Sequence, residues 1–185
     1  MKMQKSALWI TRTAVSIALL VTMQFITAQI GNQILTGSIT NLILIVAFLT
    51  CGFSTAMTVA IISPLCAMLV GVGPAFPPLV PFIALGNAAL IAAWQVLRMI
   101  DKSEKASIRH KVFCVFIAIG AALVKFLTLY FGIVKLAIPL ILNLNEKQTA
   151  VLSLSFSYPQ IITAVIGGVI ALLVVPPVRK ALKKA

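Results

Sequence analysis

The sequence predicts an all-α integral membrane protein, a six-transmembrane-helix bundle that forms a single domain over residues 1–185. The first observation behind this prediction is composition: 61% of the residues are hydrophobic and 10% are charged, whereas a soluble domain has roughly 25% charged residues. The second is that the apolar residues fall in runs near the roughly 20 residues that a helix needs to cross a bilayer. The third is that basic residues gather at the ends of these runs.

The first half of the chain contains three predicted spans. The first covers residues 7–30 and is followed by a polar segment, residues 31–37. The second, residues 38–50, is short, and a short span must thin the bilayer, be shielded by its neighbours or cross only in part. The third covers residues 53–70.

The remaining predicted spans cover residues 79–97, 112–134 and 158–175. Between the last two lies a mixed segment, residues 135–157, in which we expect Pro139 to break the helix and a short interfacial helix to follow. Pro176 and Pro177 are expected to end the sixth span.

The distribution of positive charge predicts the orientation. Twelve of the fifteen Lys and Arg residues fall on the side of the two termini, while only Lys135 and Lys147 fall on the other side and Lys125 lies inside a span. Because cytoplasmic loops carry the excess of Lys and Arg, both termini are expected in the cytoplasm of a bacterial cell, with the chain as a multi-pass protein of its plasma membrane. The net charge of +12 is then explained without nucleic acid.

One stretch, residues 71–87, interrupts the apolar pattern, and we call it the proline corner. It contains four prolines and three glycines and closes with Asn87. Proline removes a backbone donor and glycine permits close approach, so this stretch cannot be one helix. We predict a stiff turn between the third and fourth spans that faces outward and forms one wall of a small-molecule site.

Lys125 is the most informative single residue. An ammonium within the membrane is costly, and the three acids, Asp101, Glu104 and Glu146, are all expected outside the hydrocarbon. Lys125 could extend to the outer headgroups, face a water-filled cavity and meet an anionic ligand, or contact a partner subunit or lose its proton.

Other polar residues are expected at similar depth on all six spans: Gln24, Gln29, Thr40, Asn41, Ser63, Asn87, Thr128, Tyr130, Tyr158 and Gln160. Convergent polar groups in an apolar cavity are typical of a small-molecule site, although each could also be an ordinary interhelical contact. The predicted substrate-binding residues are Asn41, Asn87, Lys125, Tyr158 and Gln160.

Residues for catalysis are not evident. Cys51, Cys66 and Cys114 have no metal-ligand spacing, and His110 lies in a basic loop. The sequence has no Ser-His-Asp set, no H-E-x-x-H and no phosphate-binding loop. We therefore expect no enzyme, no cofactor and no metal site. Without an intramembrane acid or histidine for a proton relay, the chain is not expected to energise transport by itself.

Small residues four apart, Ala14 and Ala18, lie on the first span and would allow another helix to approach closely, from within the bundle or from a partner. Together with the six spans, the basic ends and the proline corner, they make the chain similar to the S components of energy-coupling-factor (ECF) transporters. Residues 73–87, 37–41 and 156–160 carry the resemblance.

The resemblance implies a substrate-binding subunit of an importer for a vitamin or related small molecule. Such a subunit captures its substrate from outside and associates with a transmembrane coupling subunit and two cytoplasmic ATPases, and Ala14 and Ala18 would contact the coupling subunit. The resemblance does not fix the substrate, although Lys125 favours an anionic one. The alternatives are a self-sufficient small carrier or channel, or a non-catalytic subunit of a membrane enzyme.

Overall fold

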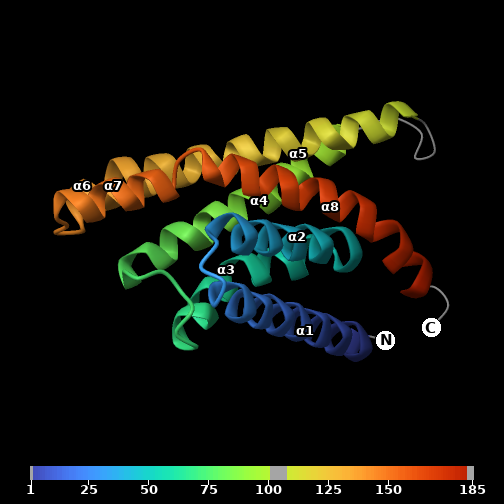
Figure 1. The fold of residues 1–185 in the computed structure, drawn as a ribbon. Helices are drawn as coiled ribbons and strands as arrows, with labels where there is room; N and C mark the ends of the chain where they lie inside the picture. Colours follow the sequence, from blue (N-terminus) through green and yellow to red (C-terminus); the bar gives the residue numbers. More distant parts are fainter. Residues whose placement is uncertain (1, 101–107, 183–185) are drawn as a thin grey trace.

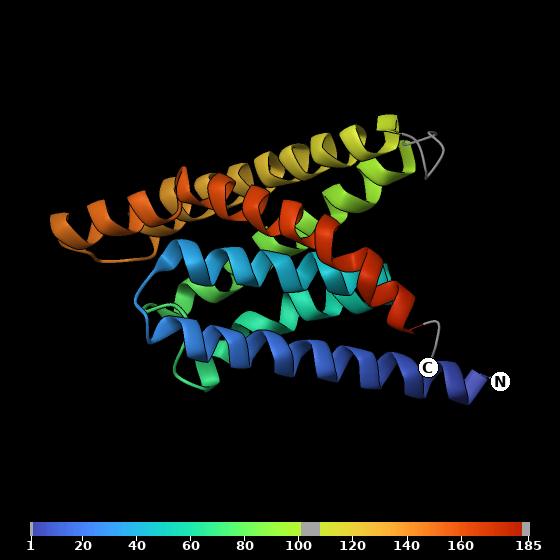
Figure 2. The same ribbon diagram turned by 45° about the vertical axis from the view of Figure 1, so that its right-hand side comes forward.

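The computed structural model describes residues 2–100 and 108–182, and over these residues the chain is helical without any β-strand. The long helices run side by side along one direction (Figures 1 and 2). Helix α1 begins and helix α8 ends at the same end of the bundle.

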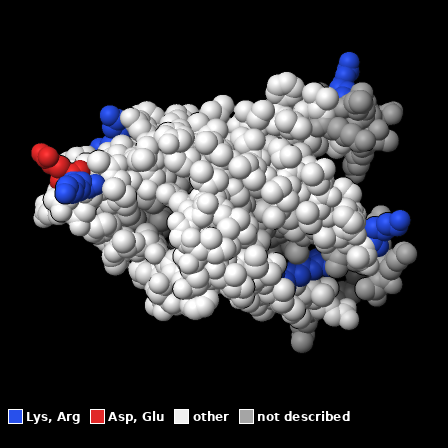
Figure 3. Space-filling view, viewed as in Figure 1, with Lys and Arg blue, Asp and Glu red and all other residues white. Residues whose placement is uncertain are grey.

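Five helical segments among the described residues are long and apolar enough to cross a membrane. These helices are compatible with the membrane location that the composition predicted. Helix α3 (Phe53–Leu69) is apolar but shorter than these five. Large apolar side chains such as Ile61, Leu127 and Leu173 are exposed along the outer surface, where lipid would cover them. Figure 3 shows a broad uncharged surface, with charged side chains toward the ends of the molecule.

The first two helices are α1 (Lys2–Ala28) and α2 (Gln33–Cys51). The prediction of a short second span is wrong, because α2 has 19 residues and includes most of the segment expected to be a polar loop. Asn32 caps the helix: its side chain accepts a hydrogen bond from the Leu35 backbone N–H at 3.1 Å. The cap lets a helix begin among polar residues.

The first part of the proline corner, residues 71–79, separates α3 from α4 (Val80–Ile100), as predicted, and the rest of the corner forms the first turns of α4. Helix α3 ends in a Schellman motif, in which Gly71 has a φ of +82° and its N–H donates to the Met68 carbonyl at 3.0 Å. Gly73 then lies so close to α3 that an added Cβ would stand 2.5 Å from the Met68 Cα. The chain enters α4 through a 3₁₀ turn, η1 (Pro77–Leu79).

The helical segment that begins with α5 (Ile108–Leu129) ends later than the predicted span of residues 112–134. It continues as a π-helix, η2 (Tyr130–Ala137), and a last turn, α6 (Ile138–Leu140), so Pro139 does not break it before residue 140. In the π-helix the N–H of residue 138 donates to the carbonyl of residue 133. Pro139 follows in the first positions of the next turn, where a missing N–H costs least.

A short helix, α7 (Glu146–Ser155), confirms the helix expected in the mixed segment. It leads into α8 (Pro159–Leu182), which runs through Pro176 and Pro177, so the predicted stop at these prolines is wrong. Beyond the prolines, Arg179 donates a hydrogen bond to the Leu49 carbonyl at the end of α2, which holds the last turns of α8 against the bundle.

Among the described residues, helices α2 and α8 share the most extensive contact of any two helices, and glycines let their backbones approach. A Cβ on Gly167 would stand 2.7 Å from the Ser38 carbonyl oxygen and 2.8 Å from the Asn41 Cβ. The core continues across α3, α4 and α5, with Leu44, Leu90 and Trp94 fully or almost fully buried. This core lies directly beside the polar residues described next.

Candidate functional site

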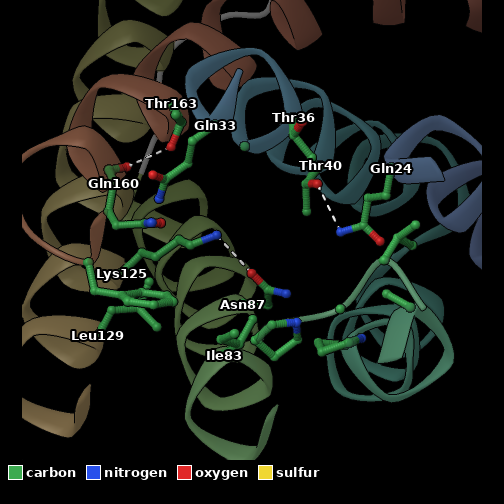
Figure 4. Close-up of a pocket in the computed structure, with 17 residues that line it drawn as sticks. Gln24, Gln33, Thr36, Thr40, Ile83, Asn87, Lys125, Leu129, Gln160 and Thr163 are labelled. Carbon is green, nitrogen blue, oxygen red and sulfur yellow. Dashed lines mark hydrogen bonds between the residues drawn. The ribbon is translucent and has the colours of Figure 1, made fainter. Parts of the chain in front are cut away.

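A cavity of about 250 Å³ lies in the half of the bundle away from the termini. Its walls come from α1, α2, α3, α4, α5 and α8, with the proline corner and Phe156 completing the lining. Cavities that hold small molecules usually measure roughly 300–1,000 Å³, so this one suits a compact ligand. Figure 4 shows polar side chains from several of these helices pointing toward one another around it.

The Lys125 side chain lies at the centre of these polar groups. It is only 4% exposed, and its Nζ donates to Asn41 Oδ1 at 2.6 Å and to Asn87 Oδ1 at 2.7 Å. The three residues come from α5, α2 and α4. Both acceptors are neutral amide oxygens, so the ammonium is hydrogen-bonded but has no carboxylate beside it within the described part of the chain. Its burial and these bonds argue against the alternative in which Lys125 extends to the headgroups.

A second row of side chains holds the Asn41 amide in place. Its Nδ2 donates to Thr163 Oγ1 on α8 at 3.3 Å, and the Thr163 hydroxyl donates to the Gln160 carbonyl at 3.2 Å. Because Nδ2 is engaged with Thr163, Oδ1 faces Lys125. Asn41 itself is 1% exposed and does not line the cavity, whereas Thr163 does.

Three glutamines bring further amide groups to the cavity. Gln24 on α1 donates through Nε2 to Thr40 Oγ1 on α2 at 3.1 Å. Gln33 and Gln160 both donate to the carbonyl of Ser155, the last residue of α7, at 2.9 and 3.0 Å. These two bonds tie the start of α2 and the start of α8 to the same point on α7.

The other walls are apolar or backbone. Ile83, Leu129 and Phe156 line one part; Leu129 belongs to a small buried cluster at this end of the bundle, and Ile83 and Phe156 pack against that cluster. Gly73 and Pro74 of the proline corner line another part, as the sequence predicted for this turn. A cavity with apolar walls and a few polar groups can bind a small molecule in one orientation.

Most of the predicted site residues come together here. Asn87, Lys125 and Gln160 line the cavity, and Asn41 contacts Lys125 from behind it. Tyr158 does not: its side chain is 56% exposed and lies outside the lining. Of the wider polar set, Gln24 and Thr40 also line the cavity, whereas Gln29, Ser63, Thr128 and Tyr130 do not. Whether any of these residues binds substrate stays a prediction.

Three polar residues of the lining were missed: Gln33, Thr36 and Thr163. The sequence could have indicated the first two, because the polar residues at positions 33, 36 and 40 have helical spacing and so share one face of a helix. They were assigned to a loop because the start of α2 was placed too late. Thr163 has no such signal, since a lone threonine is frequent in membrane helices.

Ala14 and Ala18 are both exposed on α1 and are not used for packing inside the bundle. Over residues 2–100 and 108–182 no three His, Cys, Asp or Glu side chains form a group that could hold a metal ion.

Comparisons of the chain with protein-family models, with curated proteins and with solved structures give no match.

Proposed function

We propose that the chain is the substrate-binding subunit of an ECF-type importer. In this function it captures a small anionic molecule, such as a vitamin or its precursor, from outside the cell. A transmembrane coupling subunit and two cytoplasmic ATPases would then drive release to the inside. Both termini would lie in the cytoplasm, so that the cavity opens toward the outer surface.

The observation that carries the proposal is a buried lysine side chain beside a cavity in an otherwise apolar bundle. Lys125 is hydrogen-bonded by two amide oxygens from two other helices, and it lines the cavity together with Asn87. An intramembrane ionisable residue normally marks a substrate or ion pathway. Amides, hydroxyls and one ammonium are groups that recognise a ligand through hydrogen bonds and charge.

The distribution of polar groups along the bundle supports capture from one side. The lining residues come from the C-terminal half of α1, the first turns of α2, α4 and α8, and the last turns of α3 and α5. All of these lie in the half away from the start of α1 and the end of α8. A ligand bound there would still have to pass the packed core of Leu44, Leu90 and Trp94, so release to the other side needs a further driving step.

Uptake by cells tests this function. A binding screen of the purified chain over water-soluble vitamins identifies a substrate, and uptake of that substrate is then measured with and without co-expressed coupling and ATPase subunits. We expect uptake only with the full set, and loss of uptake in Lys125→Ala but not in Lys147→Ala, which removes an exposed lysine of α7. Movement of the substrate against its gradient by the purified chain alone in liposomes would instead identify a self-sufficient carrier.

A further inference from the structure

We propose that the ligand of this cavity is a compact organic monocarboxylate, with one carboxylate oxygen at Lys125 Nζ and the other at Asn87 Nδ2. The inference rests on the proposed function in one respect, namely that this cavity is where the ligand binds. It goes further in naming the charged group of the ligand and the two atoms that hold it.

The hydrogen bonds leave N–H donors for a ligand on both residues, one on the Lys125 ammonium and two on the Asn87 amide nitrogen. An ammonium has three N–H donors, and two of those on Lys125 are used by Asn41 Oδ1 and Asn87 Oδ1. Asn87 is 2% exposed, and its Nδ2 has no hydrogen-bond partner among the described residues. Figure 4 shows the Asn87 nitrogen turned away from Lys125 and toward the side of the cavity that the proline corner lines.

The charges leave the ammonium without a counter-ion. Its two partners are neutral, and the one acid in residues 2–100 and 108–182 is Glu146, which is exposed at the start of α7. Asp101 and Glu104 lie outside the described residues. A buried charge is stabilised by an opposite charge in contact with it. A ligand that brings one negative charge into the cavity would meet this requirement.

The single cation favours a carboxylate over a phosphate. Among the described residues, Lys125 is the only Lys, Arg or His in the lining, so a phosphate dianion would keep one uncompensated negative charge between apolar walls. Phosphate sites are typically built from arginine forks or helix N-termini, whereas here the second donor is one amide on the third turn of α4. Two donors on adjacent helices match the two oxygens of a carboxylate.

An isosteric substitution outside the cavity gives a sharp test. Asn41 contacts Lys125 but does not line the cavity, so Asn41→Asp leaves the walls unchanged while it supplies an internal counter-ion. The probes are benzoate and hexanoate, their uncharged amides benzamide and hexanamide, and phenyl phosphate. Binding to the purified full chain in detergent is measured by calorimetry and by the thermal unfolding midpoint.

We expect saturable binding of benzoate or hexanoate to the wild type that exceeds binding of the matching amide and of phenyl phosphate. Asn41→Asp should weaken carboxylate binding by roughly tenfold or more, because the ammonium is already paired. Asn143→Asp makes the same change at an exposed position and should bind as the wild type does. If Asn41→Asp does not give a monodisperse protein, Asn87→Asp places the same charge on the other side of Lys125.

The proposal is overturned if no carboxylate of the set binds, if phenyl phosphate or an amide binds more tightly, or if the folded variant binds benzoate as the wild type does. These outcomes are separate from those of the uptake experiment. If the cells take up a phosphate ester or an uncharged compound and this uptake depends on the ATPases, the proposal of a carboxylate ligand fails and the proposed importer function stands. If the chain binds a carboxylate but uptake does not depend on the ATPases, the importer function fails and the carboxylate ligand stands.

Discussion

At the scale of single residues, the central question is how the protein tolerates the Lys125 ammonium without an ion pair. Placing a lysine at the centre of a membrane helix costs on the order of 2.5–3.5 kcal/mol on insertion scales. A hydrogen bond to a charged group contributes roughly 1.5–3 kcal/mol, and Lys125 makes two such bonds. The two amide oxygens can therefore offset most of the cost and still leave the charge available to a ligand.

Thr163 is predicted to act on the ligand through Asn41, as a positioning residue. Thr163→Val is nearly isosteric but removes the acceptor of the Asn41 Nδ2 bond, so the amide can rotate and Lys125 loses a fixed partner. We expect benzoate affinity to fall about fivefold, the equivalent of roughly one hydrogen bond of 1 kcal/mol. Calorimetric titration of the purified variant measures the change.

Thr163→Ser is the matched control, since it keeps the hydroxyl and loses only a methyl group. Its affinity should stay near that of the wild type. If the valine and serine variants bind benzoate equally well, Thr163 contributes packing alone, and the chain from Thr163 to Lys125 has no part in recognition.

The sequence alone selected several of the polar residues that line or adjoin the cavity. Lys125 and Asn87 stood out because charged and amide side chains are costly in a membrane helix. Asn41 stood out for the same reason, although its role behind the cavity depends on which helices are neighbours. Tyr158 was misplaced because a tyrosine near a helix end can point to either side, and Thr163 was missed because a hydroxyl can be satisfied within its own helix.

At the scale of helices, the contact between α2 and α8 sets the positions of Asn41 and Thr163. This contact depends on Gly167, where a Cβ would press on backbone atoms of α2 at 2.7 Å. Gly167→Ala must therefore move the helices apart. We expect a loss of roughly 1–3 kcal/mol in stability from overpacking and weaker benzoate binding, measured as a lower thermal unfolding midpoint and a higher Kd.

Gly120→Ala on α5 is the comparison variant. Its nearest contact would be the end of the Leu97 side chain at 3.0 Å, which can rotate away. This variant should unfold and bind much as the wild type does. Equal behaviour of the two alanine variants would show that the close approach of α2 and α8 is not required for the site.

The helix boundaries were the least predictable part of the fold. Composition identified the apolar segments and the proline corner, but prolines were given too much weight as stops. Pro139 is accommodated after a π-helix, and Pro176 and Pro177 lie within α8, where Arg179 donates a hydrogen bond to the Leu49 carbonyl of α2. How the helices accommodate these prolines depends on contacts between helices, and a single sequence does not reveal those contacts.

At the scale of the whole molecule, α1 differs from the other long helices. Only 11% of its apolar window is buried, against 33–44% in the other four segments long enough to cross a membrane. It packs on α2 and α3 and leaves its outer face uncovered. Ala14 and Ala18 are exposed near the middle of α1. A surface of small residues at this place can receive a helix of another subunit at close range.

Substitution of these alanines should therefore separate assembly from ligand binding. Ala14→Trp and Ala18→Trp add a large side chain to the exposed face of α1 and not to the cavity lining, so benzoate affinity should not change. Recovery of the coupling and ATPase subunits with the tagged chain, and uptake, should fall severalfold. Ala150→Trp, at an exposed alanine of α7, should leave both unchanged because it lies at the other end of the bundle. Normal assembly of both α1 variants would exclude this face as the coupling contact, since a helix packed closely on Ala14 and Ala18 has no room for an indole ring.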